Sequence, residues 1–254
     1  MVSLTAVYVM WLREMKRFSR ARSRVLGSLI MPLFFLAFLG LGFNRMPIPG
    51  VGRGVSYIKF LVPGILGMTL LFSSTMQGLS VLWDREFGFL KEIMVAPVSR
   101  VSIALGRIAG GVTTSLIQAV LILAVSIVLG FRIHSGLGLL AALGFMVLTS
   151  FAFIGLGLVF ASRMKDMQGF GLVMNFLVFP LFFLSGAFYP LTNLPWAIRS
   201  LSFVDPLTYG IDGLRAVLIR SHSFPLVLDF LILAGFAAAM LFLGAYSFEK
   251  SESV

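Results

Sequence analysis

Apolar stretches long enough to cross a membrane recur along this chain and constrain its fold more than any other feature. A membrane-spanning helix needs about 20 mostly apolar residues. Hydrophobic residues make up 59% of the 254 residues, and the mean hydropathy is +1.01. A transmembrane β-barrel would instead show alternating segments of about 10 residues. The sequence therefore predicts an all-α, polytopic membrane protein.

Six spans are expected in one transmembrane domain, residues 1–254. They cover residues 25–43, 60–82, 101–130, 137–161, 170–188 and 226–248. An even number of spans places both termini on one side. Thirteen of the 20 Lys and Arg residues then lie on the side of the termini. The positive-inside rule predicts cytoplasmic termini in the cell membrane, plasma or inner.

Residues 1–24 are expected to form an amphipathic helix that lies along the membrane surface. At 100° per residue its two faces are distinct. The apolar face holds Leu4, Val7, Tyr8, Trp11, Met15 and Phe18, and the basic face holds Arg13, Lys16, Arg17 and Arg20. The apolar run that follows exceeds the length of a signal-peptide core, so it should remain as an anchor.

Residues 83–100 form an island of charge between two apolar runs. The segment reads WDREFGFLKEIMVAPVSR and carries six charged residues in a chain that is only 12% charged. Such a segment is expected to stand in water beside the membrane. At helical spacing Phe87, Leu90, Ile93 and Met94 share one apolar face. This region is therefore the expected contact with a partner.

The segment 189–225, on the opposite side, predicts two short helices. Asp205 and Pro206 form an N-cap with proline at the first helical position, and apolar residues follow at helical spacing up to Ile219. About 14 residues cannot span a bilayer. A second helix is expected within 195–203. These helices either enter the membrane part-way and return or cover the spans, and an amphipathic surface helix is the alternative.

No residue is assigned a catalytic, cofactor-binding or metal-ligating role. The chain has no cysteine, and its two histidines have no partner at metal-site spacing. No Gly-Lys pair occurs, which excludes a phosphate-binding loop of the G-x-x-x-x-G-K-[S/T] type. The net charge of +10 is explained by topology rather than by nucleic acid. The chain is thus not expected to be an enzyme, and any ATP must be bound by another chain.

Two charged residues near the spans have simple interpretations. Arg107 lies one or two turns inside the third span, where its long side chain could extend to the lipid headgroups. Asp229 lies in the first turn of the last span, where the helix dipole favours an anion. Neither residue indicates a proton relay across the membrane.

Three stretches resemble the membrane subunits of type-2 ABC transporters, the permeases of the daunorubicin-exporter and nodulation-factor-exporter type. The stretches are WDREFGFLKEIMVAPVSRVSIALGR (83–107), FPLFFLSGAFYPLTNLP (179–195) and FVDPLTYGIDGLRAVL (203–218). The resemblance implies six spans, an N-terminal connecting helix, a coupling helix in 83–100 and re-entrant helices before the last span. It also implies a homodimer that works with two copies of a separate ATPase subunit, which binds ATP and Mg.

On this resemblance the expected ATPase contacts are Arg85, Glu86, Phe87, Phe89 and Leu90. Alternating access would require a cavity lined by the second and fifth spans. Residues that share one face at helical spacing are the predicted lining of the substrate path. They are Met68, Phe72 and Met76 in the second span and Phe176, Phe179 and Phe183 in the fifth span. Methionine and phenylalanine provide adaptable apolar surface, which favours amphipathic substrates, drug or lipid-like, as in multidrug efflux.

Two alternatives remain open from the sequence. The same kind of permease could export polysaccharide or a lipid-linked glycan, for which a hydroxyl-rich path would be typical. A channel or scaffold without ATP coupling is the other alternative. Reversing the charge of Arg85 or Glu86 would abolish ATPase coupling in the permease and leave the channel or scaffold unaffected.

Overall fold

The computed structural model describes residues 3–43, 56–87, 98–164 and 166–251, and every regular element in these ranges is a helix. Six helical segments are long and apolar enough to cross a membrane, which confirms the predicted all-α fold with six spans. The elements are α1 (Leu4–Arg20), α2 (Arg22–Gly42), α3 (Tyr57–Thr75), α4 (Gln77–Glu86), α6 (Arg100–Val128), α7 (Gly136–Arg163), α8 (Met167–Leu184), the 3-10 turn η1 (Leu191–Asn193), α9 (Trp196–Ser202), α10 (Pro206–Ile219) and α11 (Leu226–Ser251).

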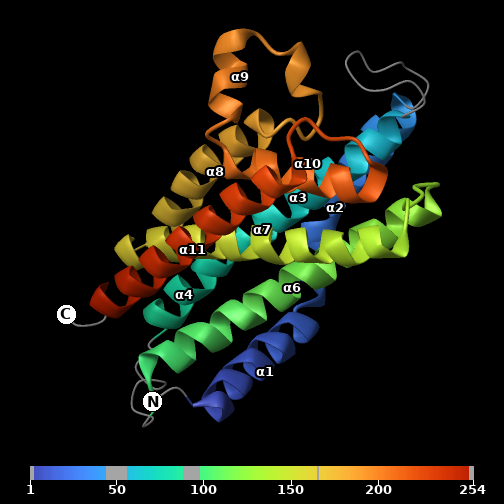
Figure 1. Ribbon diagram of the computed structural model, residues 1–254. Helices are drawn as coiled ribbons and strands as arrows, with labels where there is room; N and C mark the ends of the chain where they lie inside the picture. The colour runs from blue at the N-terminus through green and yellow to red at the C-terminus, as the bar shows by residue number, and fades with distance from the viewer. Residues whose placement is uncertain (1–2, 44–55, 88–97, 165, 252–254) are drawn as a thin grey trace.

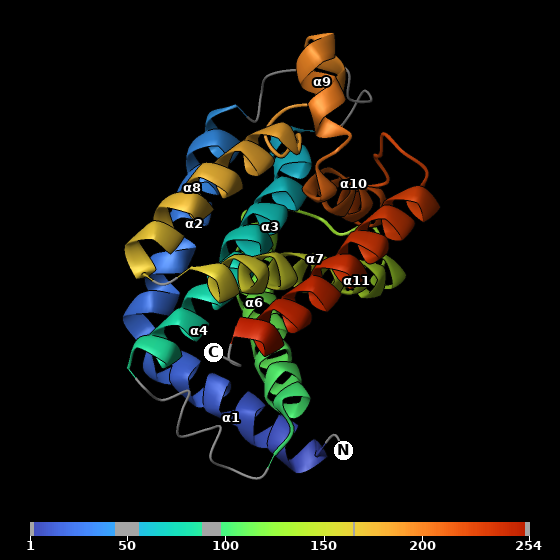
Figure 2. The ribbon, with the colours of Figure 1, turned by 90° about the vertical axis from the view of Figure 1, so that its left-hand side faces the viewer.

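The helices form one bundle with distinct ends (Figure 1). Helix α1 lies at the end that also holds the N-terminus, and α9 and α10 lie at the opposite end. Figure 2 shows the same arrangement from the side, with α3 in the interior between α2, α8 and α7. The C-terminal end of α4, where the charged segment begins, and the short helices α9 and α10 thus lie at opposite ends of the bundle.

Helix α3 is the centre of the bundle and is buried on nearly all sides from Ile58 to Leu71. A helix that is apolar all round is expected to be buried in this way. Two glycines allow neighbouring elements to approach it closely. A Cβ atom on Gly64 would collide with the carbonyl of Ala187, and one on Gly67 would collide with the side chain of Ile211. Small residues therefore bring α10 and the turn after α8 against α3.

The second candidate span, Tyr57–Asp84, is divided into two helices at Met76. Helix α3 ends at Thr75 and α4 begins at Gln77. The Thr75 hydroxyl donates to the carbonyl of Leu71 at 2.7 Å, a back-bond that bends helices. A Cβ atom on Gly78 would also collide with the carbonyl of Gly157 on α7. The break therefore fits α4 closely against α7.

The fifth span is displaced from the predicted 170–188. Helix α8 begins at Met167, after Asp166 as its N-cap, and ends at Leu184. The chain then turns at Gly186, whose φ of +70° favours glycine. Phe188, the end of the predicted span, therefore belongs to the turn region and not to the helix.

Helix α10 begins as predicted, with Asp205 as N-cap and Pro206 as its first residue. It is not an amphipathic surface helix, because residues on all its faces are buried against α3, α7 and α11. Arg215, which the sequence placed in an exposed outer segment, is buried inside this contact. Its guanidinium donates to the carbonyls of Gly186 (2.8 Å) and Ala187 (3.1 Å) and lies over the Phe60 ring.

Two ionisable groups of this region have shifted pKa values. Burial lowers the pKa of Arg215 to about 10, opposed by the nearby charge of Asp212, so the guanidinium stays protonated at neutral pH. Burial raises the pKa of Asp205 to about 8, although the hydrogen bond from the Leu207 N–H opposes this shift. The carboxyl of Asp205 is therefore mostly neutral at pH 7 in the folded protein.

We expect Gly64→Ala to destabilise the bundle. The added methyl group meets backbone atoms of Ala187, which cannot rotate away, and overpacking of this kind costs about 1–3 kcal/mol. Gly144→Ala on α7 is the matched control, because a Cβ atom there meets nothing within 4 Å. Thermal unfolding in detergent measures both. Equal unfolding temperatures for the two variants would contradict the close approach at Gly64.

We expect the stability of the protein to contain a component that falls as pH rises from about 4 to about 8. The pKa of Asp205 is higher in the folded chain than its usual value of 3.8, so this component is fully present below about pH 4 and is lost through pH 8. Its slope is at most about 1.4 kcal/mol per pH unit. Asp205→Asn keeps an N-cap but cannot titrate. The slopes of unfolding free energy against pH should therefore differ between the two proteins, and parallel slopes would contradict the shift.

Candidate functional site

Helix α1 is docked along α6 by close backbone contact. A Cβ atom on Gly106 would lie 2.7 Å from the Val7 carbonyl, and one on Gly110 would lie 2.6 Å from the Cβ of Glu14. The Trp11 indole N–H also donates to the Thr113 hydroxyl at 3.1 Å. Glycines four residues apart form a groove for a neighbouring helix. Helix α1 therefore packs on the bundle, while Leu4 and Tyr8 of its apolar face remain exposed.

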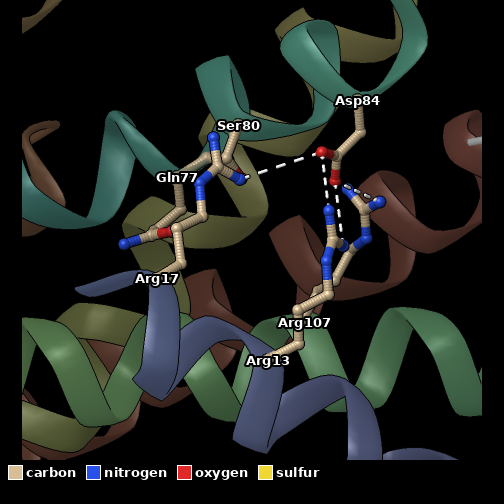
Figure 3. Close-up of polar contacts among 6 residues, drawn as sticks. All are labelled: Arg13, Arg17, Gln77, Ser80, Asp84 and Arg107. Atoms are coloured by element: carbon tan, nitrogen blue, oxygen red, sulfur yellow. Dashed lines mark hydrogen bonds and ion pairs between the residues drawn. The ribbon is translucent and has the colours of Figure 1, made fainter. Parts of the chain in front are cut away.

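Asp84 is the centre of an ion cluster that joins three helices (Figure 3). Arg13 of α1 donates to both carboxylate oxygens, at 2.8 and 3.2 Å. Arg107 of α6 donates to Oδ2 at 2.7 Å. The Nη1 of Arg17 lies 3.8 Å from Oδ1, and its guanidinium lies over the Trp83 ring. We call Asp84, Arg13, Arg17 and Arg107 the Asp84 cluster.

The Asp84 cluster corrects two expectations from the sequence. Asp84 was placed in a segment standing in water, but it is only 6% exposed. Arg107 was expected to extend to lipid headgroups, but it is 7% exposed and turns inward to Asp84. The two side chains compensate each other, because a buried charge requires a partner. Sequence spacing could not show this pairing, since it depends on the tilt of α4 after the break at Met76.

A cavity of about 480 Å³ lies next to the Asp84 cluster. Its walls come from α1, α2, α3, α4, α6 and α8. The polar lining contributed by α1, α4 and α6, which we call the polar end of the cavity, includes Glu14, Arg17, Gln77, Thr114 and Gln118. The remaining walls are mostly apolar, with Met31, Pro32, Met68, Phe72, Met76 and Phe179 among them. Ligand sites commonly have volumes of about 300–1,000 Å³, so the cavity could accept a small amphipathic molecule.

The residues nominated for the substrate path divide into two groups. Met68, Phe72, Met76 and Phe179 line the cavity, and the rings of Phe72 and Phe179 are in edge contact, with centroids 5.4 Å apart. Phe176 and Phe183 do not line it. Phe176 is 87% exposed on α8, and Phe183 is about half exposed. The face of α8 that meets the cavity is therefore narrower than its stripe of phenylalanines.

The residues nominated for ATPase contact lie at the edge of the described chain. Phe87 follows α4 directly and is 78% exposed. Arg85 and Glu86 are in the last turn of α4, and their side chains lie outside the described structure. Phe89 and Leu90 lie outside the described residues altogether. The structure therefore places only the base of segment 83–100, which is tied to α1 and α6 through Asp84.

Three buried polar residues of the interior were missed by the sequence reasoning: Glu14, Gln118 and Arg215. Glu14 could have been found, because at 100° per residue it lies beside Val7 and Phe18 at the edge of the apolar face of α1. Gln118 carries the single amide side chain of α6. Arg215 carried no signal, since buried and exposed arginines look alike in a sequence.

The six candidate spans, the buried ion cluster and the cavity between helices define a multi-pass membrane protein with an internal binding space. The chain matches the model of the family described as ABC-2 type transporter over residues 5–219. It therefore belongs to the ABC-2 type transporter family, and the resemblance stated from three short stretches is confirmed.

Curated relatives agree with this membership. The inner membrane transport permease YadH of Escherichia coli (strain K12) is 32% identical over 238 residues, which cover 92% of this chain and 91% of the relative. Nodulation protein J of Rhizobium meliloti (strain 1021) is 30% identical over 205 residues, covering 79% of this chain and 76% of the relative. The chain is thus a membrane transport protein of this family.

We expect Asp84→Asn and Arg107→Gln each to destabilise the protein, because each removes the 2.7 Å ion pair between these two buried side chains. Breaking a buried pair typically costs about 3–5 kcal/mol. The double variant should cost less than the sum of the two, since neither charge is then left behind. Unfolding in denaturant measures the cycle. Arg13→Gln is the control and should cost less, because its side chain is 26% exposed. Additive losses for Asp84 and Arg107 would contradict the pairing.

Proposed function

We propose that this chain is the membrane-spanning permease subunit of an ATP-driven exporter of amphipathic, drug-like or lipid-like molecules. It works by alternating access with a separate ATPase subunit. The observation that carries the proposal is the Asp84 cluster. It ties the base of segment 83–100 to α1 and α6, directly beside the cavity that Arg17 and Trp83 help to line.

The cluster offers a route for mechanical coupling. A force on segment 83–100 would act at the end of α4, and Asp84 would pass it to α1 through Arg13 and to α6 through Arg107. Buried ion pairs are strongly directional and resist separation. The walls of the cavity would then move together. Phe87, Phe89 and Leu90, with Arg85 and Glu86, are the proposed contacts with the ATPase.

The cavity supports an amphipathic substrate. Its apolar walls suit a hydrocarbon or aromatic body, and its polar end suits a charged head. Met68, Phe72, Met76 and Phe179 are the proposed path residues on this chain. Methionine side chains adapt to varied shapes, and specificity would come from the polar end.

The remaining parts of the assembly follow from the same proposal. Two copies of this chain form a homodimer, and two ATPase subunits bind ATP and Mg at the cytoplasmic face. Both termini of this chain face the cytoplasm, which places α1 and segment 83–100 on the side of the ATPase and α9 and α10 outside. The excess of Lys and Arg at the α1 end supports this orientation.

The test is affinity purification of this chain from its native membrane in mild detergent. We expect an ATPase with a phosphate-binding loop to be recovered with the wild-type chain and lost with the double variant Phe89→Asp, Leu90→Asp, because two carboxylates cannot enter an apolar seat. Trp196→Asp is the matched control. Its side chain is 83% exposed on α9, at the opposite end of the bundle, so it should retain the ATPase.

Two outcomes would oppose the proposal. Recovery of the folded wild-type chain without an ATPase would favour a channel or scaffold without ATP coupling. Recovery of the ATPase with the double variant would show that Phe89 and Leu90 do not contribute to the contact with the ATPase. A further variant separates binding from coupling, since Arg13→Gln, the milder change to the Asp84 cluster, should still bind the ATPase but weaken substrate-stimulated ATP hydrolysis.

A further inference from the structure

The polar end of the cavity holds two opposite charges that do not pair with each other. Glu14 and Arg17 are one turn apart on α1, and both line the cavity. Side chains at this spacing are neighbours, about 5–6 Å apart at Cβ, and opposite charges there usually attract. Arg17 instead turns toward Trp83 and Asp84. The stem of Glu14 packs against Gly110 of α6. The two charges are therefore held apart at the cavity wall.

Glu14 is accompanied by a second acceptor from α6. Glu14 and Gln118 are each 7% exposed, and the Oε1 atom of each is buried without a hydrogen-bond partner among the described residues. Gly110 and Gln118 are eight residues apart, two turns along one face of α6. Leaving a buried acceptor unpaired costs about 1–3 kcal/mol. Two such atoms in the lining of one cavity indicate a donor group that the described residues do not supply.

Arg17 supplies the complementary donors. A guanidinium has five N–H groups, and Arg17 donates no hydrogen bond to any described residue. Its nearest carboxylate, Asp84, is 3.8 Å away and is already bonded by Arg13 and Arg107. In Figure 3 a single dashed line joins the Arg17 guanidinium to the Asp84 carboxylate. Arg17 can therefore bind an anionic group in the cavity.

We propose that this cavity binds a zwitterionic amphiphile, with its ammonium group on Glu14 and Gln118 and its anionic group on Arg17. The apolar body lies along Met31, Phe72 and Phe179. This assignment rests on the proposed export function, because it names the class of the exported substrate. An amphiphile with only a positive charge would face Arg17, one with only a negative charge would face Glu14, and an uncharged one would leave both unpaired.

The experiment compares four probes on the full chain in lipid nanodiscs by calorimetric titration. Lysophosphatidylethanolamine carries both charges and a hydrocarbon chain. An alkylamine and an alkyl phosphate of the same chain length carry one charge each, and phosphoethanolamine carries both charges without a chain. We expect the lysolipid to bind at least about tenfold more tightly than the other three, since each charged hydrogen bond contributes about 1.5–3 kcal/mol.

Two conservative variants test which protein side chain binds each charged group of the lysolipid. Glu14→Gln should lower lysolipid affinity to about that of the alkyl phosphate, and Arg17→Gln should lower it to about that of the alkylamine. Lys16→Gln is the matched control. It removes a charge from the same helix but does not line the cavity, so it should leave all four affinities unchanged.

The wild-type titrations alone decide the proposal if a variant fails to fold. Equal affinity for the three amphiphiles, preference for either single charge, or no saturable binding would overturn it. If phosphoethanolamine bound as tightly as the lysolipid, the hydrocarbon chain would contribute nothing to binding. The proposal of an amphiphile site would then be wrong, and the cavity would be a site for the charged headgroup alone. These measurements need no ATPase, so failure of the proposed export function appears separately, in the purification experiment.

Discussion

The architecture of the α1 end of this bundle depends on one carboxylate. Asp84 accepts hydrogen bonds from Arg13 and Arg107, with Arg17 nearby, and these residues come from α1, α4 and α6. Each arginine is buried or partly buried, so without Asp84 three positive charges would lie together with little water to separate them. The position of α1 on the bundle and the angle at which α4 leaves the membrane therefore depend on this anion.

Close helix packing explains how the cavity coexists with that cluster. Gly106 and Gly110 bring α1 against α6, and Gly78 brings α4 against α7. Helices held so closely at the glycines separate where larger side chains stand, and the cavity occupies the space between α1, α2, α3, α4, α6 and α8. One wall residue, Arg17, also faces Asp84. Ligand binding in the cavity and force at the end of α4 would therefore act on the same side chain, which is the physical basis for coupling in the proposed exporter.

The sequence predicted the helices well and their charged contacts poorly. The six spans, the helix cap at Asp205 and Pro206 and the family resemblance depend on local patterns, and all of these were correct. Arg107 and Asp84 were misplaced, because a charge near a span end has the same local signal whether it faces lipid headgroups or a partner on another helix. Four residues proposed for the substrate path line the cavity, while Phe176 and Phe183 do not. A stripe shows which residues share a face, not where that face points.

The sequence by itself determined that this chain is an all-α, six-span protein, because the length and apolar character of each segment decide whether it can lie in a hydrocarbon core. It also determined the family, through motifs that are local in the chain. Only the tertiary structure decided which charges are compensated. Glu14, Gln118 and Arg17 reach one cavity wall, and Arg215 reaches the carbonyls after α8, through glycine contacts and a helix break. Those contacts set the rotation of each helix, and no single segment contains the information that fixes it.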